Sequence, residues 1–349
     1  MGATGVASQR KTIEESIERN KEKYIETSHD IHANPEIGNQ EFYASRTLSL
    51  LLGSAGFQLQ HNIAGHETGF IARKSSGKQG PAIAFLAEYD ALPGLGHACG
   101  HNLIGTISVA AAIALSETLE EIGGEVVVFG TPAEEGGPNG SAKSSYVKAG
   151  LFKDIDAALM IHPSGKTATT SPSLAVDPLD FHFYGKTAHA AARFFIRAAT
   201  RKRCAEVTEK VRNIAEGAAL ATGAKVKIHQ FQNEIDELLV TKTYNDIVAE
   251  ELELLGEDVN RKERVGIGST DAGNVSQVVP TIHPYIKIGP DDLIAHTNEF
   301  REAARSELGD KALITSAKAL ANTAYRLITE EGLLEKVKEE FREVQRNQG

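Results

Sequence analysis

Two histidines and a cysteine lie within residues 97–102, in the order His-Ala-Cys-Gly-His-Asn. Cysteine, histidine and carboxylate side chains are the usual ligands of a borderline divalent metal. Cys99 and His101 alone are weak evidence, because a buried cysteine beside a surface histidine is the more common arrangement. Four further candidate ligands occur downstream, and the whole set favours a dinuclear hydrolytic site over a single structural ion. They are Glu134, Glu135, His162 and His296.

Glu134 and Glu135 are adjacent carboxylates, and such a pair can divide two tasks between its members. One carboxylate can hold a metal while the other takes a proton from the activated water. In isolation the pair is more often a solvated turn, and His162 or His296 could equally be a core or surface histidine. Cys99 also remains a candidate for a papain-like nucleophile. The neighbouring histidine and the glutamate pair favour metal binding instead.

Composition and motif content argue against several classes of protein. The formal net charge of −10 disfavours nucleic acid or an anionic membrane as a partner. The longest apolar stretch, residues 104–115, is too short to span a bilayer, and the N-terminus lacks the apolar core of a signal peptide. No Gly-x-Ser-x-Gly elbow of a serine hydrolase occurs. With only two cysteines there is no disulfide framework, which predicts a cytoplasmic protein.

The elements that must position the candidate residues alternate along the chain. Apolar runs at residues 82–86, 125–130 and 156–161 predict buried strands, and a long helix is expected at 102–122, with Asn102 as its N-cap. Alternating strands and helices predict an α/β fold with a mainly parallel sheet. Further helices are expected at 11–26, 44–56 and 312–328, and a further strand of the same layers at 284–288.

The candidate residues follow the predicted strands closely. Asp90 comes after the first strand, the Glu134-Glu135 pair after the second and His162 directly after the third. All would lie beyond the carboxyl ends of parallel strands, where open α/β sheets place their ligands. Cys99 precedes a helix whose N-terminal dipole favours a thiolate. Ligands that are distant in sequence therefore converge at one edge of the sheet.

One segment interrupts this alternation with a different order of predicted strands and helices. Strands are expected at residues 179–184, 193–198 and 225–230, and a helix at 201–222, which together predict a small α+β unit. The length of 349 residues also suggests about two domains. We therefore expect one domain formed by residues 1–175 and 231–349, with residues 176–230 inserted into it.

Five motifs occur in an order that resembles the M20 metallopeptidase family, in its amidohydrolase branch, subfamily D. The resemblance is strongest to p-aminobenzoyl-glutamate hydrolase subunits, N-acyl-amino acid amidohydrolases and related dipeptidases. It implies a zinc-peptidase-like catalytic domain, with a mainly parallel sheet, and an inserted α+β lid that forms dimers. The motifs are residues 88–94, 96–102, 132–136, 185–190 and 269–274.

The resemblance also implies a role for each candidate residue. Two divalent ions, zinc or manganese with cobalt as an alternative, would be held by five side chains, with the cysteine bridging. Glu134 would act as the general base and later protonate the leaving amine. His189, at the start of the lid, would reach the site of a second subunit and stabilise the oxyanion. The implied ligands are Cys99, His101, Glu135, His162 and His296.

Substrate contacts are implied in the same way. Arg197 resembles the lid arginine that clamps a substrate carboxylate, and Asp90 is expected to orient a metal ligand. A short loop is expected to line the substrate pocket. It consists of Ser269, Thr270 and Asp271.

The chain departs from the family pattern in two places. Other branches place a histidine ligand where Glu88 stands, so Glu88 is a ligand, an outer residue that supports one, or neither. The family lid reads β-α-β-β-α-β, whereas here a helix and a strand are missing after about residue 192. This indicates either a deletion or a segment left out of this sequence.

Taken together, these residues predict a metal-dependent amidohydrolase that cleaves an N-acyl-amino acid or a dipeptide-like substrate. A homodimer or higher homo-oligomer is expected through the lid. One alternative is an aminopeptidase or dipeptidase of the same fold. Another is a non-catalytic binding protein that retains the metal site. The incomplete lid favours this last alternative, whereas the presence of Glu134 opposes it.

Overall fold

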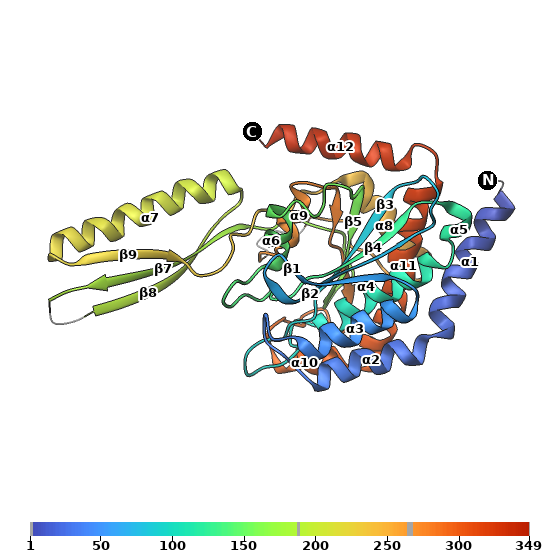
Figure 1. Cartoon of the computed structure of the whole chain (residues 1–349), viewed down its shortest axis with the longest axis horizontal. Coiled ribbons are helices and arrows are strands. Elements are labelled where there is room, and N and C mark those ends of the chain that lie inside the picture. The colour runs from blue at the N-terminus through green and yellow to red at the C-terminus, as the bar shows by residue number, and fades with distance from the viewer. Residues whose placement is uncertain (1–2, 187–188, 264–267, 349) are drawn as a thin grey trace.

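A six-stranded sheet with the strand order β1-β2-β4-β3-β5-β10 forms the centre of the main body (Figure 1). The computed structural model describes residues 3–186, 189–263 and 268–348. Strands β4, β3, β5 and β10 run parallel, whereas β1 and β2 continue the sheet in antiparallel fashion, so the predicted α/β fold with a mainly parallel sheet is confirmed. The strands are β1 (Gln58–Ile63), β2 (His66–Ser75), β3 (Ala82–Ala87), β4 (Glu125–Gly130), β5 (Ala157–Leu159) and β10 (Thr281–Ile282).

Strand β3 shows why these sequences form the centre of the sheet. All six of its residues are buried, as expected for a parallel strand covered on both faces. Because successive side chains point to opposite faces, Ile83 and Phe85 enter the larger hydrophobic core, and Ala84 and Leu86 enter a second core on the other face. Helices therefore pack against both sides of the sheet (Figure 1).

The helices lie close to their predicted positions, with three informative differences. The long helix expected to run to residue 122 ends at Ser116, and a separate short helix follows at Leu119–Ile122. The helix expected at residues 11–26 is divided at Asn20 into two. The helix expected from residue 102 begins at His101, because Gly100 has a φ of 77° and makes the turn into it. The prediction that Asn102 is an N-cap is therefore wrong. Its amide lies inside the helix and donates to Ser28 Oγ, at 3.0 Å.

Eleven described helices belong to the main body, and among the described residues none is long and apolar enough to cross a membrane. They are α1 (Ala3–Arg19), α2 (Lys21–Ala33), α3 (Phe42–Ser54), α4 (His101–Ser116), α5 (Leu119–Ile122), α6 (Ala142–Lys148), α8 (Lys242–Leu254), α9 (Ala272–Ser276), α10 (Asn298–Ala303), α11 (Glu307–Thr329) and α12 (Leu333–Asn347).

A second, two-stranded sheet adjoins the central one and corrects two strand predictions. The run expected to form one strand at 156–161 ends as β5 at Leu159, and β6 (His162–Ser164) follows it. Strand β11 (Tyr285–Lys287) pairs in parallel with β6 and not with the central sheet. Pro284 lies between β10 and β11 and interrupts the pairing of this segment, because proline has no backbone N–H to donate to the neighbouring strand. His162 thus begins a short strand and does not follow the end of one.

The inserted segment forms an arm that projects from the main body (Figure 1). Its strands form an antiparallel sheet in the order β8-β7-β9, and α7 packs on one face of that sheet. The elements begin and end next to the predicted boundaries at 176 and 230, while the separate action of this unit as a lid stays a prediction. They are β7 (Ala175–Tyr184), β8 (His189–Ala198), α7 (Arg201–Thr222) and β9 (Lys225–Gln230).

Strand β8 passes through the position where the family pattern has additional elements. It pairs with β7 without interruption from His189 to Ala198. Its other edge has no strand beside it among the described residues. The helix and strand that the family pattern has here, and that the sequence was predicted to lack, have no counterpart in the described part of the arm.

Candidate metal centre

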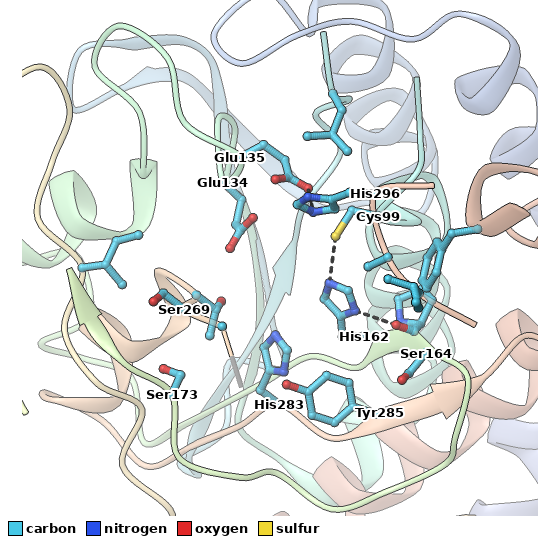
Figure 2. A pocket seen from close by; sticks show the side chains of 18 of the residues that line it. Cys99, Glu134, Glu135, His162, Ser164, Ser173, Ser269, His283, Tyr285 and His296 are labelled. Carbon is cyan, nitrogen blue, oxygen red and sulfur yellow. Dashed lines mark hydrogen bonds and ion pairs between the residues drawn. The ribbon is translucent and has the colours of Figure 1, made fainter. Parts of the chain in front are cut away.

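Four of the five predicted ligands line a cavity of about 730 Å³ at the carboxyl edge of the central sheet (Figure 2): Cys99, Glu135, His162 and His296. The fifth, His101, is buried beside Cys99 and His162. Gly100 brings two of the ligand segments together, since a Cβ at this position would lie 2.8 Å from Cγ of Pro163. This close approach places Cys99 beside His162. The backbone N–H of His296 donates to the carbonyl of Ala98 at 2.8 Å, which fixes the third segment against the same loop.

The donor atoms form two groups that share Cys99. One group consists of Cys99, His101 and His162, and the other of Cys99, Glu135 and His296, each with its donor atoms within 4.8 Å of one another. Cys99 Sγ lies 3.5 Å from Nε2 of His162, and Nε2 of His296 lies 3.3 Å from Oε1 of Glu135.

These donors fit a pair of divalent ions in their chemistry as well as their positions. Sulfur, imidazole nitrogen and carboxylate oxygen are the donors that zinc and similar ions prefer. Nε2 of His101 is buried without a hydrogen-bond partner among the described residues, as expected for an atom that awaits a ligand. Burial lowers the pKa of His162 to about 4, so its ring is neutral and free to coordinate.

Asp90 supports two of the predicted ligands at once. One of its carboxylate oxygens bonds Nδ1 of His101 at 2.8 Å, which leaves Nε2 free at 3.9 Å from a carboxylate oxygen of Glu134 and of Glu135. The other oxygen accepts the backbone N–H of Glu135 at 2.9 Å. A buried carboxylate that fixes a ligating histidine in this way is a common feature of metal sites. Asp90 therefore contacts two of the predicted ligands, and its orienting role stays a prediction.

The environments of the two adjacent glutamates push their pKa values apart. Burial and the nearby charges of Glu88 and Glu135 raise the pKa of Glu134 well above its usual range. Burial also opposes the ionisation of Glu135, but the hydrogen bond from His296 and the charge of His101 outweigh it and lower the pKa. Such a divergence is typical of carboxylates with different catalytic tasks.

A buried ion-pair network behind the cavity was not predicted from the sequence. The ammonium of Lys143 lies 2.7 Å from a carboxylate oxygen of Glu88 and 2.5 Å from one of Asp271, and all three side chains are fully buried. Burial opposes the charge of Glu88, but Lys143 more than offsets this and lowers its pKa to about 2. Asp271, expected in the substrate pocket, instead lies behind it.

His283 is a second residue that the sequence analysis missed. It lines the cavity, its ring stacks on that of His162 with centroids 5.3 Å apart, and neither ring nitrogen has a hydrogen-bond partner among the described residues. Burial lowers its pKa to about 3. The signal that could have found it is a repeated dipeptide, because histidine precedes proline both at 162–163 and at 283–284.

The residues expected to contact substrate are only partly brought together. Arg197, Ser269 and Thr270 line the cavity, and Nη1 of Arg197 donates to Oγ of Ser269 at 3.3 Å. His189 does not lie there. It begins β8, at the end of the arm that points away from the main body (Figure 1).

Comparison with known proteins gives a consistent result. A model of the peptidase family M20/M25/M40 matches residues 84–326. The chain is 33% identical over 396 residues to the Xaa-Arg dipeptidase of Mus musculus, covering 94% of this chain and 91% of that protein. It is 26% identical over 460 residues to a p-aminobenzoyl-glutamate hydrolase subunit of Escherichia coli (strain K12), covering 95% of this chain and 94% of that protein. Both alignments exceed the 349 residues of this chain, so these relatives carry segments that it lacks.

Solved structures share the fold. A dinuclear metal-binding M20 peptidase of Bacillus subtilis, YXEP, superimposes with a TM-score of 0.68 at 20% identity, covering 89% of this chain and 99% of that one. The aminobenzoyl-glutamate utilization protein of Klebsiella pneumoniae gives a TM-score of 0.67 at 16% identity, covering 89% of this chain and 98% of that one.

Proposed function

Because the chain belongs to the M20 peptidase family, we propose that it is a metal-dependent amidohydrolase that cleaves N-acyl-amino acids or dipeptides with Glu134 as general base. Its relatives are named dipeptidases and amidohydrolases, and hydrolysis of an amide bond is the activity they share. One observation carries the proposal: two groups of metal donors share Cys99, and Glu134 borders the same cavity outside those two groups, although it forms further groups with His101 and Glu135 and with Glu88 and Asp271.

The two glutamates divide the proton chemistry between them. Bound divalent ions would supply Lewis-acid activation of the attacking water and of the scissile carbonyl. Glu134, made more basic by burial and the charges of Glu88 and Glu135, takes a proton from the water as its oxygen bonds to the carbonyl carbon. It then delivers the proton to the nitrogen as the C–N bond breaks. Glu135 stays ionised, as a ligand requires.

The charges that line the cavity bear on the class of substrate. Arg197, supported by Ser269, offers a cation for a substrate carboxylate. Among the described residues only Glu134 and Glu135 contribute carboxylates to the lining, and both have other tasks. A basic side chain would therefore find no free counter-ion. We propose a preference for substrates with neutral side chains, unlike the relatives named for cleavage before arginine.

The remainder of the cavity wall supports this preference. Apolar side chains from both the main body and the base of the arm face the cavity, and they suit an apolar acyl or amino-acid side chain. They include Leu92, Leu293, Phe300, Val176 and Ile235.

The position of His189 bears on the oligomeric state. It is too far along the arm to reach the cavity of its own chain, so we propose that it serves the site of a second copy. The alternative is a different partner chain, as the name of the Escherichia coli relative suggests for that protein. Because both cysteines are free, we also propose a cytoplasmic location.

The proposal is tested by elemental analysis of the purified protein for zinc, manganese and cobalt, together with a panel of substrates. The panel pairs each Xaa-Arg dipeptide with its neutral isostere and includes N-acyl-amino acids and p-aminobenzoyl-glutamate. We expect two ions per chain, and a higher kcat/KM for the neutral member of each pair. A protein that binds two ions but hydrolyses none of these would instead be a binding protein that retains the metal site.

Replacement of the general base gives the most direct test. Glu134→Ala should keep both ions but lose turnover by about 10²–10⁴-fold, the usual contribution of a positioned base. Glu26→Ala, on an exposed face of α2, serves as the control. Full activity in Glu134→Ala would contradict the role assigned to this carboxylate.

A further inference from the structure

Glu41 connects the N-terminal part of the chain to the loop that carries Glu134. Its side chain is fully buried, just before α3. Oε1 accepts the backbone N–H of Ala133 at 2.8 Å, and Oε2 accepts the hydroxyl of Thr68 at 2.7 Å. The carboxylate is thus fixed at both oxygens, and one of them holds the residue immediately before the proposed base.

Ala133 has a backbone conformation that needs such support. Its φ is +58°, in the left-handed region, which residues with a Cβ rarely adopt. Conformations of this kind persist only where the surrounding structure imposes them, and they concentrate at active sites. Besides the bond to Glu41, the carbonyl of Ala133 accepts the N–H of Ser141 at 2.7 Å.

The segment that leads to Glu41 lies tightly against the same loop. A Cβ at Gly38 would lie 2.6 Å from the carbonyl oxygen of Gly136 and 2.9 Å from Cβ of Ala133, so only glycine fits there. The amide of Asn39 donates to the carbonyl of Pro138 at 2.9 Å. The N-terminal segment therefore forms one wall against which the loop after β4 is held.

The loop is anchored separately on the two sides of Glu134. Upstream, Glu41 holds the N–H of Ala133. Downstream, Asp90 holds the N–H of Glu135 and also fixes His101. Two of the predicted metal ligands, His101 and Glu135, therefore depend on Asp90, whereas the direction of the Glu134 side chain depends on the conformation of Ala133.

We propose that Glu41 is a positioning residue that holds Ala133 in the left-handed conformation and so directs the carboxylate of Glu134 into the cavity. The catalytic part of this inference rests on the proposed function, because it takes Glu134 as the general base. The conformational part does not, since it concerns only the backbone of the loop.

The kinetic test compares Glu41→Ala with Glu41→Gln. Glutamine keeps a carbonyl oxygen for the N–H of Ala133, and its NH₂ group can donate to Thr68. We expect Glu41→Ala to lower kcat by on the order of 10²-fold, the effect of a displaced catalytic group, with KM and metal content unchanged. Glu41→Gln should keep most of the turnover. Equal losses in both variants would assign the effect to charge and overturn the proposal.

A second substitution tests the conformation itself. Glycine adopts positive φ without a steric penalty, so Ala133→Gly in the Glu41→Ala background should recover part of the lost kcat. If Glu41→Ala does not fold, Thr68→Val carries the test, because it frees one oxygen of Glu41 while keeping the shape of the side chain. It should lower kcat less strongly, again with unchanged metal content. Unchanged kcat in a folded Glu41→Ala, or in Thr68→Val where Glu41→Ala does not fold, would overturn the proposal.

Crystal structures of the metal-free variants provide a readout that does not need activity. In Glu41→Ala, Ala133 should leave positive φ and the Glu134 carboxylate should move, while the N–H of Glu135 stays on Asp90. Ala133 retained at positive φ would contradict the inference. If the unmodified protein hydrolyses no amide, the proposed function fails, and these structures still decide the role of Glu41. Asp90→Asn is the matched control: its metal-free structure should keep Ala133 at positive φ, and in solution it should bind metal more weakly.

Discussion

The carboxyl edge of the central sheet and the projecting arm differ in how deeply their ion pairs are buried. At the sheet edge, Lys143 is fully buried between two carboxylates. On the arm, Arg193 and Asp180 lie as close, at 2.7 Å, but the arginine side chain is 58% exposed. Exposed pairs contribute little to stability, whereas breaking a buried pair is costly. Charge pairing therefore contributes more to the stability of the sheet edge than to that of the arm.

Hydrophobic packing follows the same division. The arm has its own small core, formed mainly around Leu179, Phe181 and Ile196. The two phenylalanines of β8, at positions 194 and 195, are each 49% exposed. Chemistry that needs fixed distances is consequently placed in the main body, and the arm contributes Arg197 to the cavity from its base.

The largest effect is expected from Lys143→Met, which would break the buried network. The substitution leaves the charges of Glu88 and Asp271 unpaired, at a cost of about 3–5 kcal/mol in the free energy of unfolding. Urea denaturation of the metal-free protein measures this change. Lys148→Met on the same helix removes a half-exposed partner of Glu234 and should cost no more than about 1 kcal/mol. Equal losses in the two variants would remove the contrast between buried and exposed charge.

A smaller effect, on binding alone, is expected from Arg197→Ala. Loss of a charge-assisted hydrogen bond to a substrate carboxylate costs about 1.5–3 kcal/mol, which corresponds to a rise in KM of roughly 10–100-fold. Unfolding should be unchanged, because the side chain is exposed. Arg193→Ala, on the same strand but outside the cavity, is the control. An unaltered KM in Arg197→Ala would show that the carboxylate binds elsewhere.

The smallest effect on stability is expected from Phe194→Ser at the exposed edge of the arm. The unfolding free energy should change by less than about 1 kcal/mol, as is usual for surface positions. If a second copy covers this edge, the same substitution should reduce the mass measured by sedimentation. A dimer that persists unchanged would place the contact away from β8.

Much of the site could be predicted because it depends on a simple rule of topology. Parallel strands end at the same edge, so residues after β3 and β4 had to converge whatever their distance in sequence. The arm was predictable for a similar reason, since its strands and helix carry strong local patterns. The exact start of α4 was not, because it depends on the left-handed turn at Gly100.

The buried network could not be predicted from the sequence. Lys143 and Asp271 are 128 positions apart. Asp271 lies in one of the family motifs, but nothing in the local sequence of either residue indicates that the two side chains pair. The same holds for Glu41, which reaches Ala133 across 92 positions. Pairings of this kind are decided by packing in three dimensions. His283 was not predicted, but the sequence does contain a signal for it, because its histidine-proline dipeptide repeats that of His162.

The sharing of Cys99 between two donor groups has a thermodynamic consequence. The donors come from segments between Cys99 and His296, so the complete set exists only in the folded chain. Any ion that binds there stabilises the native state through mass action, by about 4 kcal/mol when its free concentration is a thousand times its Kd. Because both groups use one sulfur, the two binding equilibria are linked to each other as well as to folding. The stability of the folded chain would then depend on the free concentration of the metal, and a chelator would remove this contribution.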